Sequence, residues 1–166
     1  HFHTIDADDP FFDPDAVIKS LKLLKSYDLI LPSKISRNGG ASEGYSFKFS
    51  SIKNLYNSLY DFKFKKINNL DTEMIDYFID RLKVKKKLFK GMKYQLKKET
   101  RLTLDYKKDY ILFKKIFENF SIFAERKDIN NFLKKNHKLM NKNIYLNHIW
   151  GKKQKNFIIP RLKWKK

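Results

Sequence analysis

The chain has 166 residues, of which 42% are hydrophobic and 16% aromatic, enough apolar material for one globular domain with a buried core. It contains no cysteine, which excludes disulfide bonds and thiolate metal sites, and no apolar run approaches the roughly 20 residues that a membrane-spanning helix needs. The formal net charge is +19. We therefore expect a cytoplasmic protein without a membrane partner.

The positive charge is compatible with an anionic partner, but lysine supplies most of it. Arginine, which reads phosphates and base edges more often, is scarce, so the composition alone does not favour nucleic acid. A basic nucleic-acid-binding module stays open as an alternative, because aromatic and lysine side chains are interleaved over residues 88–98. No acidic residue occurs after residue 128, and we interpret residues 151–166 as a basic tail.

The first elements are expected to be a strand, a helix and a second strand. Residues 1–5 alternate like a strand and lead into a loop rich in aspartate. Asp13 is expected to cap a helix with Pro14 in its first turn. The apolar stripe of that helix would consist of Val17, Ile18, Leu21 and Leu24. Residues 28–33 indicate a short buried strand, and this order is a βαβ unit, which implies a parallel sheet covered by helices.

The next segments continue this mixture of strands and helices. A glycine-rich loop at residues 36–44 precedes a strand candidate at 45–49 and a helix at 50–62. A further helix is expected over residues 71–82. Two strand candidates, 87–96 and 100–106, then follow in succession.

Two helices complete the expected order. Residues 107–120 have a helical apolar stripe formed by Tyr110, Phe113, Phe117 and Phe120. Asp128 is a plausible cap for a shorter helix that ends near residue 136.

Two aspartates follow probable strands, Asp8 after the first strand and Asp105 after the candidate at 100–106. Strand ends of an open parallel sheet face a common crevice, so these carboxylates are expected to converge. Mg²⁺ takes one or two protein carboxylates and completes its shell with water and phosphates, which fits such a pair. Ordinary turn and cap roles explain Asp6, Asp13 and Asp15 equally well.

Several blocks resemble one enzyme family. Residues 4–14, "TIDADDPFFDP", are similar to the segment of cytidylyltransferases that activate acidic sugars in which a Gly-Asp-x-Pro-type turn precedes Asp-Pro; Asp8, Pro10, Asp13 and Pro14 match. Blocks at 39–55, 71–75, 101–117 and 130–150 resemble, in the same order, later parts of the spore-coat-polysaccharide type, which is related to the CMP-Kdo and acylneuraminate synthetases.

The resemblance implies an α/β fold: an open, mostly parallel, Rossmann-like nucleotidyltransferase sheet with helices on both faces and a small inserted β segment. A cytidylyltransferase-like domain would span residues 1–150 and would be its C-terminal portion. The sheet would be incomplete at the N-terminus, because the family's first strand and nucleotide-binding loop should precede residue 1.

The resemblance also implies a Mg²⁺-dependent transfer of CMP from CTP to an acidic sugar, with release of pyrophosphate, for surface polysaccharide biosynthesis. Asp8 and Asp105 match the metal-binding aspartates, and Ser42 and Glu43 would lie near the acceptor sugar. CTP, an acidic sugar and a second copy in a homodimer are the implied partners. A catalytically inactive fragment of the transferase fold is a further alternative.

One departure concerns the second aspartate. The family usually has Asp-Thr-Pro-Glu-Asp here, whereas this chain has Asp105-Tyr106-Lys107-Lys108-Asp109. The helix is therefore expected to lose its cap and its proline. Two lysines would also lie close to the proposed metal, where they would hold phosphates or compete with the cation.

Overall fold

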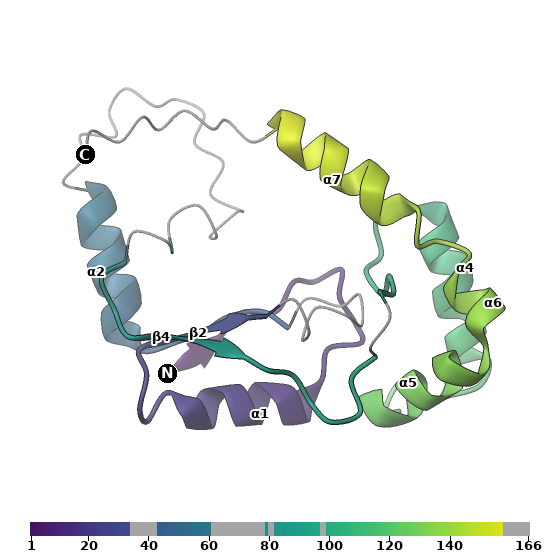
Figure 1. Cartoon of the computed structure of the whole chain (residues 1–166), viewed down its shortest axis with the longest axis horizontal. Helices are drawn as coiled ribbons and strands as arrows, with labels where there is room; N and C mark the ends of the chain where they lie inside the picture. Colours follow the sequence, from purple (N-terminus) through teal and green to yellow (C-terminus); the bar gives the residue numbers. More distant parts are fainter. Residues whose placement is uncertain (34–42, 61–78, 80–81, 97–98, 158–166) are drawn as a thin grey trace.

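The computed structural model describes residues 1–33, 43–60, 79, 82–96 and 99–157 (Figure 1). This part contains four strands, which form one sheet, and six helices. The strands are β1 (Phe2–His3), β2 (Leu29–Pro32), β3 (Ser46–Phe47) and β4 (Lys86–Phe89). The helices are α1 (Pro14–Leu23), α2 (Phe49–Tyr60), α4 (Lys107–Phe117), α5 (Arg126–Lys135), α6 (His137–Met140) and α7 (Leu146–Phe157). The helix expected over 71–82 lies almost wholly outside the described residues, so it stays a prediction.

The sheet is mixed, with the strand order β1-β3-β2-β4. Only β2 and β4 pair in parallel, whereas β3 runs antiparallel to both β1 and β2. The expectation of a mostly parallel sheet is wrong, because β3 is inserted between the two strands of the expected βαβ unit. An open α/β sheet is confirmed, and β1 and β4 are its edges within the described residues.

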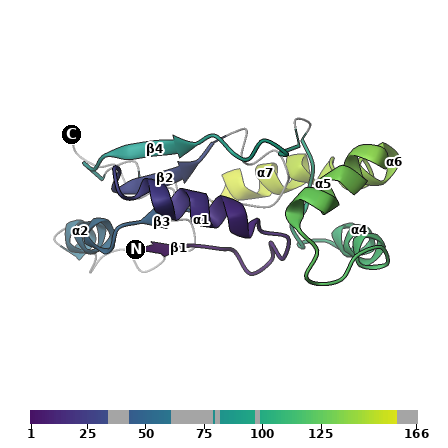
Figure 2. The ribbon, with the colours of Figure 1, turned by 90° about the horizontal axis from the view of Figure 1, so that it is seen from below.

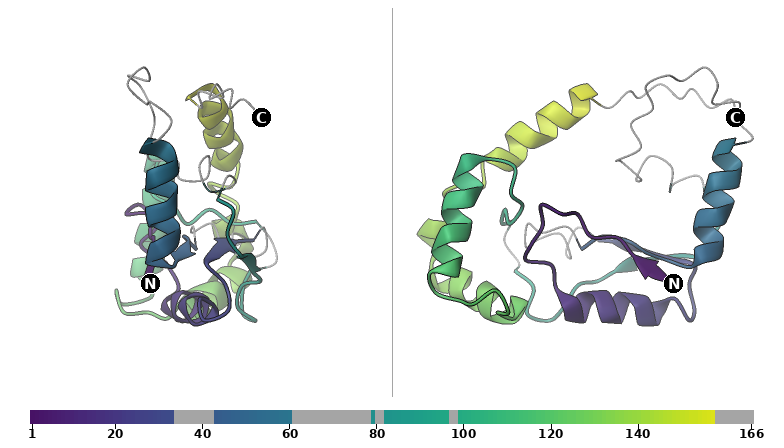
Figure 3. Two further views of the ribbon diagram at one scale, coloured as in Figure 1. Left: turned by 90° about the vertical axis from the view of Figure 1, so that its left-hand side faces the viewer. Right: turned by 180° about the vertical axis from the view of Figure 1, so that it is seen from behind.

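Helices cover both faces of this sheet, as expected. Successive residues of β2 point to opposite sides: Leu29 packs with Phe47 and Leu55 of α2, and Ile30 packs with α1. Figures 1 and 3 show α1 running along one face of the sheet and α2 standing at one end of the strands on the other side, and Figure 2 looks onto the α1 side. The register of the strands agrees with this division into two faces. Phe47 lies opposite both Phe2 and Leu29 in the sheet, and all three residues belong to the cluster on the α2 side.

A second core lies among α4, α5 and α6, at the end of the sheet away from α2 (Figure 2). Leu112, Phe113 and Ile116 of α4 pack there against Ile129 and Leu133 of α5. Phe11, from the aspartate-rich loop, packs into the same core with its ring centroid 4.7 Å from that of Phe113. The loop that holds Asp8 is thereby tied to the helical part.

The expected apolar stripes of two helices are only partly correct: Leu21 and Leu24 pack in the core on the α1 side of the sheet, and Phe113 and Phe120 pack in the helical core. In α4, Tyr110 and Phe117 are exposed, and the buried face consists of Asp109, Leu112, Phe113 and Ile116. In α1, Ile18 is half exposed, while Ala16 and Ser20 are buried. Small residues face the sheet because α1 lies close to β3, where the Ser20 and Ser46 hydroxyl oxygens are 2.7 Å apart.

The aspartate caps were predicted with mixed success. Asp13 caps α1 as expected, and its side chain accepts hydrogen bonds from the N–H groups of Asp15 and Ala16. The prediction that Asp128 caps a helix is wrong: α5 begins at Arg126 after Glu125, which places Asp128 inside the first turn. Acidic side chains are stabilised in the first turn by the positive end of the helix dipole as well as at the cap position. An aspartate near the start of a helix therefore does not by itself identify the cap.

The two strand candidates after residue 86 differ in outcome. Residues 86–89 form β4, but residues 90–96 do not continue the strand. Residues 100–106 join no sheet, so the second candidate is wrong; the inserted β segment stays a prediction. The burial does not alternate either, because Thr100, Arg101 and Leu102 are all buried, whereas Leu104 is exposed.

Candidate functional site

The loop from Ile5 to Phe12 folds through two consecutive turns. The Asp9 N–H donates to the Asp6 carbonyl (3.1 Å), and the Phe12 N–H donates to the Asp9 carbonyl (3.2 Å). This loop then meets the segment at 100–106, because the Leu104 N–H donates to the Asp8 carbonyl (2.9 Å). The Thr103 hydroxyl also donates to the Asp8 carboxylate (3.1 Å), so both the backbone and the side chain of Asp8 are held.

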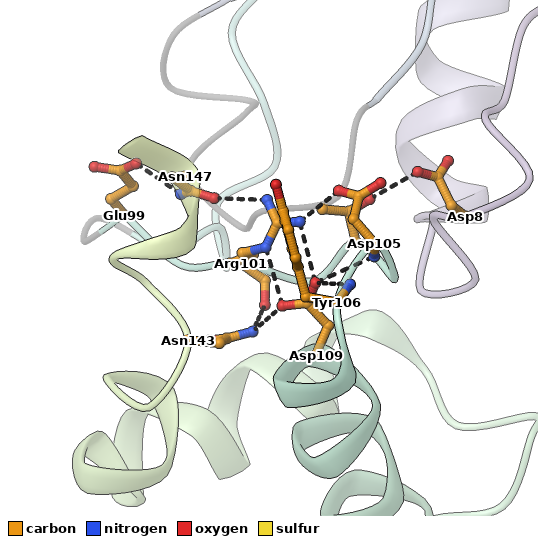
Figure 4. Close-up of polar contacts among 9 residues, drawn as sticks. Asp8, Glu99, Arg101, Asp105, Tyr106, Asp109, Asn143 and Asn147 are labelled. Carbon is orange, nitrogen blue, oxygen red and sulfur yellow. Dashed lines mark hydrogen bonds and ion pairs between the residues drawn. The ribbon is translucent and has the colours of Figure 1, made fainter. Parts of the chain in front are cut away.

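These contacts bring Asp8 and Asp105 together, although they lie far apart in the sequence (Figure 4). Their carboxyl groups are close enough for their charges to repel each other. Burial raises the pKa of Asp105, and the Asp8 carboxyl raises it further, whereas Arg101 opposes both effects. Two carboxyl groups in this arrangement favour the uptake of a proton or a cation.

Arg101 lies behind this pair, and its side chain is 2% exposed. Its Nε donates to Asp109 Oδ1 (2.9 Å) and its Nη2 to Asp109 Oδ2 (3.1 Å). The same Nη2 donates to Asp105 Oδ2, and Nη1 donates to the Asn147 side chain (3.1 Å). The guanidinium is therefore paired with two carboxylates and one amide.

Asp109 is fully buried and holds the start of α4. Besides Arg101, its carboxylate accepts from the N–H groups of Asp105 (3.1 Å) and Tyr106 (2.9 Å) and from Asn143 (2.8 Å). The expected loss of the helix cap is thus only partly correct. Tyr106 makes no side-chain cap of its own, but Asp109 binds the Tyr106 N–H from the third helical position.

The network reaches α7 through two asparagines. Asn143 donates to the Arg101 carbonyl (3.1 Å), and Asn147 donates to Glu99 (2.7 Å) while it accepts from Arg101 (Figure 4). α7 runs across residue 150, where the basic tail is expected to begin. That division of the chain stays a prediction.

Further cations lie near the carboxylate pair. Two cations contact the Tyr106 ring. The Arg101 Cζ atom lies 5.1 Å from the ring centroid, and the Lys153 Nζ atom of α7 lies 5.4 Å from it. Lys108 lies over the Tyr145 ring at 4.9 Å. Lys108 and Lys153 are exposed residues, so their ammonium groups stay accessible to solvent and to anionic groups.

The donor set fits Mg²⁺ in kind and in charge. Mg²⁺ takes oxygen ligands and keeps most of its water, so two carboxylates suffice when phosphates supply the rest. No group of three or more potential metal ligands gathers within the described residues, which argues against an all-protein cage there. Asp109 balances the charge of Arg101, which leaves the two charges of Asp8 and Asp105 for a divalent cation.

Glu43 lies in a different polar cluster from the carboxylate pair, and Ser42 lies outside the described residues. Burial raises the pKa of Glu43 to about 7; the charge of Arg126 opposes this shift, and that of Asp13 adds to it. Arg126 is itself buried and donates to the Phe11 carbonyl and to Asn130 (3.0 Å). The described contacts do not bring Glu43 to Asp8 or Asp105.

Sequence reasoning missed Arg101, Asp109 and Asn143 as members of the site. A signal for Arg101 was present: it is one of few arginines in a lysine-rich chain, and it precedes an apolar alternating run four residues before Asp105. An arginine in such a run is buried only when carboxylates pair with it, and Asp105 and Asp109 both follow at helical spacing. Asn143 carries no comparable signal.

Comparison with known proteins adds no relative to this description. No protein family profile, curated protein or solved structure matches the chain. Among the helices of the described part, none combines the length and apolar character that crossing a membrane requires.

Proposed function

We propose that this chain has a Rossmann-like nucleotidyltransferase fold and transfers CMP from CTP to an acidic sugar with Mg²⁺, releasing pyrophosphate, in cytoplasmic synthesis of surface polysaccharide. The observation that supports this most is the contact between the carboxyl groups of Asp8 and Asp105. These are the two residues that match the metal-binding aspartates of the cytidylyltransferases that the sequence resembles.

In this proposal, the chain mainly positions its ligands and balances their charge. Bound Mg²⁺ would neutralise the phosphates, so that a sugar hydroxyl can attack the α-phosphorus and pyrophosphate can leave. Asp8 and Asp105 would hold the cation. Lys108 and Lys153, which contact the Tyr145 and Tyr106 rings, would attract the remaining phosphate charge. These lysines would contribute positive electrostatic potential and would form no covalent bond to the substrate.

The acceptor side of the proposal concerns Ser42 and Glu43. Glu43 is half-buried beside Arg126 and Asp13, and its Oε2 atom makes no hydrogen bond within the described residues. A sugar hydroxyl would supply the missing donor, which is why we keep Glu43 as a substrate-binding residue. The homodimer implied by the resemblance also belongs to this proposal.

A thermal-stability titration tests the assignment. Mg²⁺ and CTP at about 100 times the Kd should stabilise the parent by about 2.7 kcal/mol, a rise in Tm of roughly 5–11 °C for a chain of this size. Asp8→Asn and Asp105→Asn should lose this response, whereas the exposed Asp128→Asn in α5 should keep it. If both site variants respond as the parent does, the metal assignment is wrong.

The nucleic-acid alternative makes a different prediction for the same protein. Binding to random oligonucleotides should weaken linearly with salt on a log-log plot, and Asp8→Asn should leave it intact or strengthen it. A nucleotide pocket should instead discriminate CTP from ATP. Tight, salt-sensitive oligonucleotide binding without a CTP response would favour the alternative over the transferase.

A further inference from the structure

Arg101 connects the candidate metal pair to a fully buried carboxylate. Three of its nitrogens are used: Nε on Asp109, Nη2 on Asp109 and Asp105, and Nη1 on Asn147. The Arg101 side chain is 2% exposed, whereas that of Asp105 is 27% exposed. The guanidinium therefore holds Asp105 from the protein interior, and the accessible side of the Asp105 carboxylate faces Asp8 and solvent (Figure 4).

We propose that Arg101 is a positioning residue: held rigidly by Asp109, it orients the Asp105 carboxylate so that Asp105 and Asp8 together bind a divalent cation. The proposal rests on the proposed function, because it assumes a cation at that pair. It adds a residue that touches neither the cation nor the substrate, and that acts only through the carboxylate it binds.

The geometry of the carboxylate supports this role. A carboxylate has two oxygens with about four lone-pair positions, and Arg101 engages Oδ2. Oδ1 is left to accept a cation. The backbone of Asp105 is fixed as well, because its N–H donates to Asp109 (3.1 Å). Asp105 is thus constrained at both ends by the same Arg101–Asp109 pair.

The charge distribution explains why the arginine does not simply repel the cation. Asp109 accepts two hydrogen bonds from the guanidinium, so the Arg101 charge is largely compensated by a carboxylate that is 0% exposed. A lysine would keep the charge, but it has a single donor atom and cannot bond Asp105, Asp109 and Asn147 in one plane. Arg101→Lys therefore separates orientation from charge.

Mn²⁺ serves as the probe, because electron paramagnetic resonance counts the free ion and gives a Kd without any catalytic assay. In the full chain, Arg101→Lys should weaken Mn²⁺ binding by about 10- to 100-fold, the usual effect of losing a residue that orients a metal ligand. Lys48→Arg is the control, an equally charge-conserving change, since Lys48 pairs with Asp28 and none of its described contacts reaches Asp105 or the loop that holds Asp8. It should keep the parent Kd, even if both variants lose stability.

The outcomes separate orientation from charge. A purely electrostatic role predicts an unchanged Kd for Arg101→Lys and tighter binding for Arg101→Gln, and either result would overturn the proposal. Should Arg101→Lys fail to fold, Asn147→Ala removes the acceptor of Nη1 from α7 without a change in charge. This variant should weaken Mn²⁺ binding in the same direction, and a parent-like Kd would overturn the proposal.

The same experiment distinguishes this inference from the proposed function. Absence of Mn²⁺ binding by the parent would overturn both. Binding by the parent that Arg101→Lys leaves unchanged overturns the role of Arg101 alone. If Mn²⁺ binding depends on Arg101 but CTP produces no response, the orientation of the pair holds and the cytidylyltransferase assignment fails.

Discussion

Replacing Asp109 by asparagine should be among the most destabilising single changes in the described part of the chain. The carboxylate accepts five N–H donors and is fully buried. Oδ1 accepts from Arg101 Nε and Asn143, and Oδ2 accepts from Arg101 Nη2 and two backbone N–H groups. An amide NH₂ cannot accept at either place, so at least two donors lose their acceptor whichever way the side chain turns.

The magnitude follows from the buried charge. Breaking a buried ion pair by removing one partner costs about 3–5 kcal/mol. The same carboxylate also binds the Tyr106 N–H at the start of α4, so the cost of losing that contact is already part of this figure and is not added to it. We expect a loss of about 4 kcal/mol in the free energy of unfolding. For a chain of this size, that corresponds to a Tm lower by roughly 8–16 °C.

Urea denaturation followed by circular dichroism measures this loss. Asp128→Asn is the control, because Asp128 lies in the first turn of α5 in the same way but is exposed. It should cost no more than about 1 kcal/mol, the usual dipole effect. A loss for Asp109→Asn below about 1 kcal/mol, or equal to that of Asp128→Asn, would refute the reasoning about the buried network.

Three further predictions concern the loop beside β3 and helix α7. Gly44 has φ +61°, and a Cβ there would lie 1.7 Å from the Thr4 carbonyl oxygen, so Gly44→Ala should lower Tm sharply. Gly151→Ala, with open space around its Cβ inside α7, should stabilise the protein by up to about 1 kcal/mol in the same melting assay. Glu43 has its pKa raised from 4.5 to about 7, so its proton is bound more tightly in the folded state. The free energy of unfolding should therefore fall, by up to about 3 kcal/mol, as pH rises through that window. Urea titrations at several pH values should show that Glu43→Gln removes this slope, and an identical slope in both proteins would contradict the assignment.

Local sequence signals predicted those parts of the fold that depend on neighbours in the chain. The cap at Asp13, the strands around Leu29 and Phe47, and the helix that begins at Lys107 were all identified. Each follows from a cap residue, an alternation or a helical period within a few residues.

What the sequence could not predict depends on contacts across the chain. The antiparallel insertion of β3 between β1 and β2 is decided by sheet pairing, for which a two-residue strand carries no signal. The apolar stripe of α4 was predicted only in part, because aromatic residues at 110 and 117 outweighed the buried Asp109, whose burial depends on the distant pairing with Arg101. Periodicity places apolar residues inside, and it does not anticipate a buried carboxylate.

For the candidate site, the sequence singled out both Asp8 and Asp105, and the structure brings their carboxyl groups together. Their role as metal ligands stays a prediction. The buried residues around Asp105 were not foreseen, since Arg101, which bonds Asp105, and Asn143, which bonds the Arg101 carbonyl, have no motif of their own.

The lysines of β4 limit how two copies of this chain can meet. β4 borders the sheet and is preceded by Lys85, with Lys86 and Lys87 as its first residues. A second copy aligned along this strand would bring its own ammonium groups against them, a repulsion that discourages continuous sheets between molecules. The opposite border, β1, offers only two residues for pairing. A homodimer of this chain is therefore expected to form through side-chain surfaces rather than by extension of the sheet through β4.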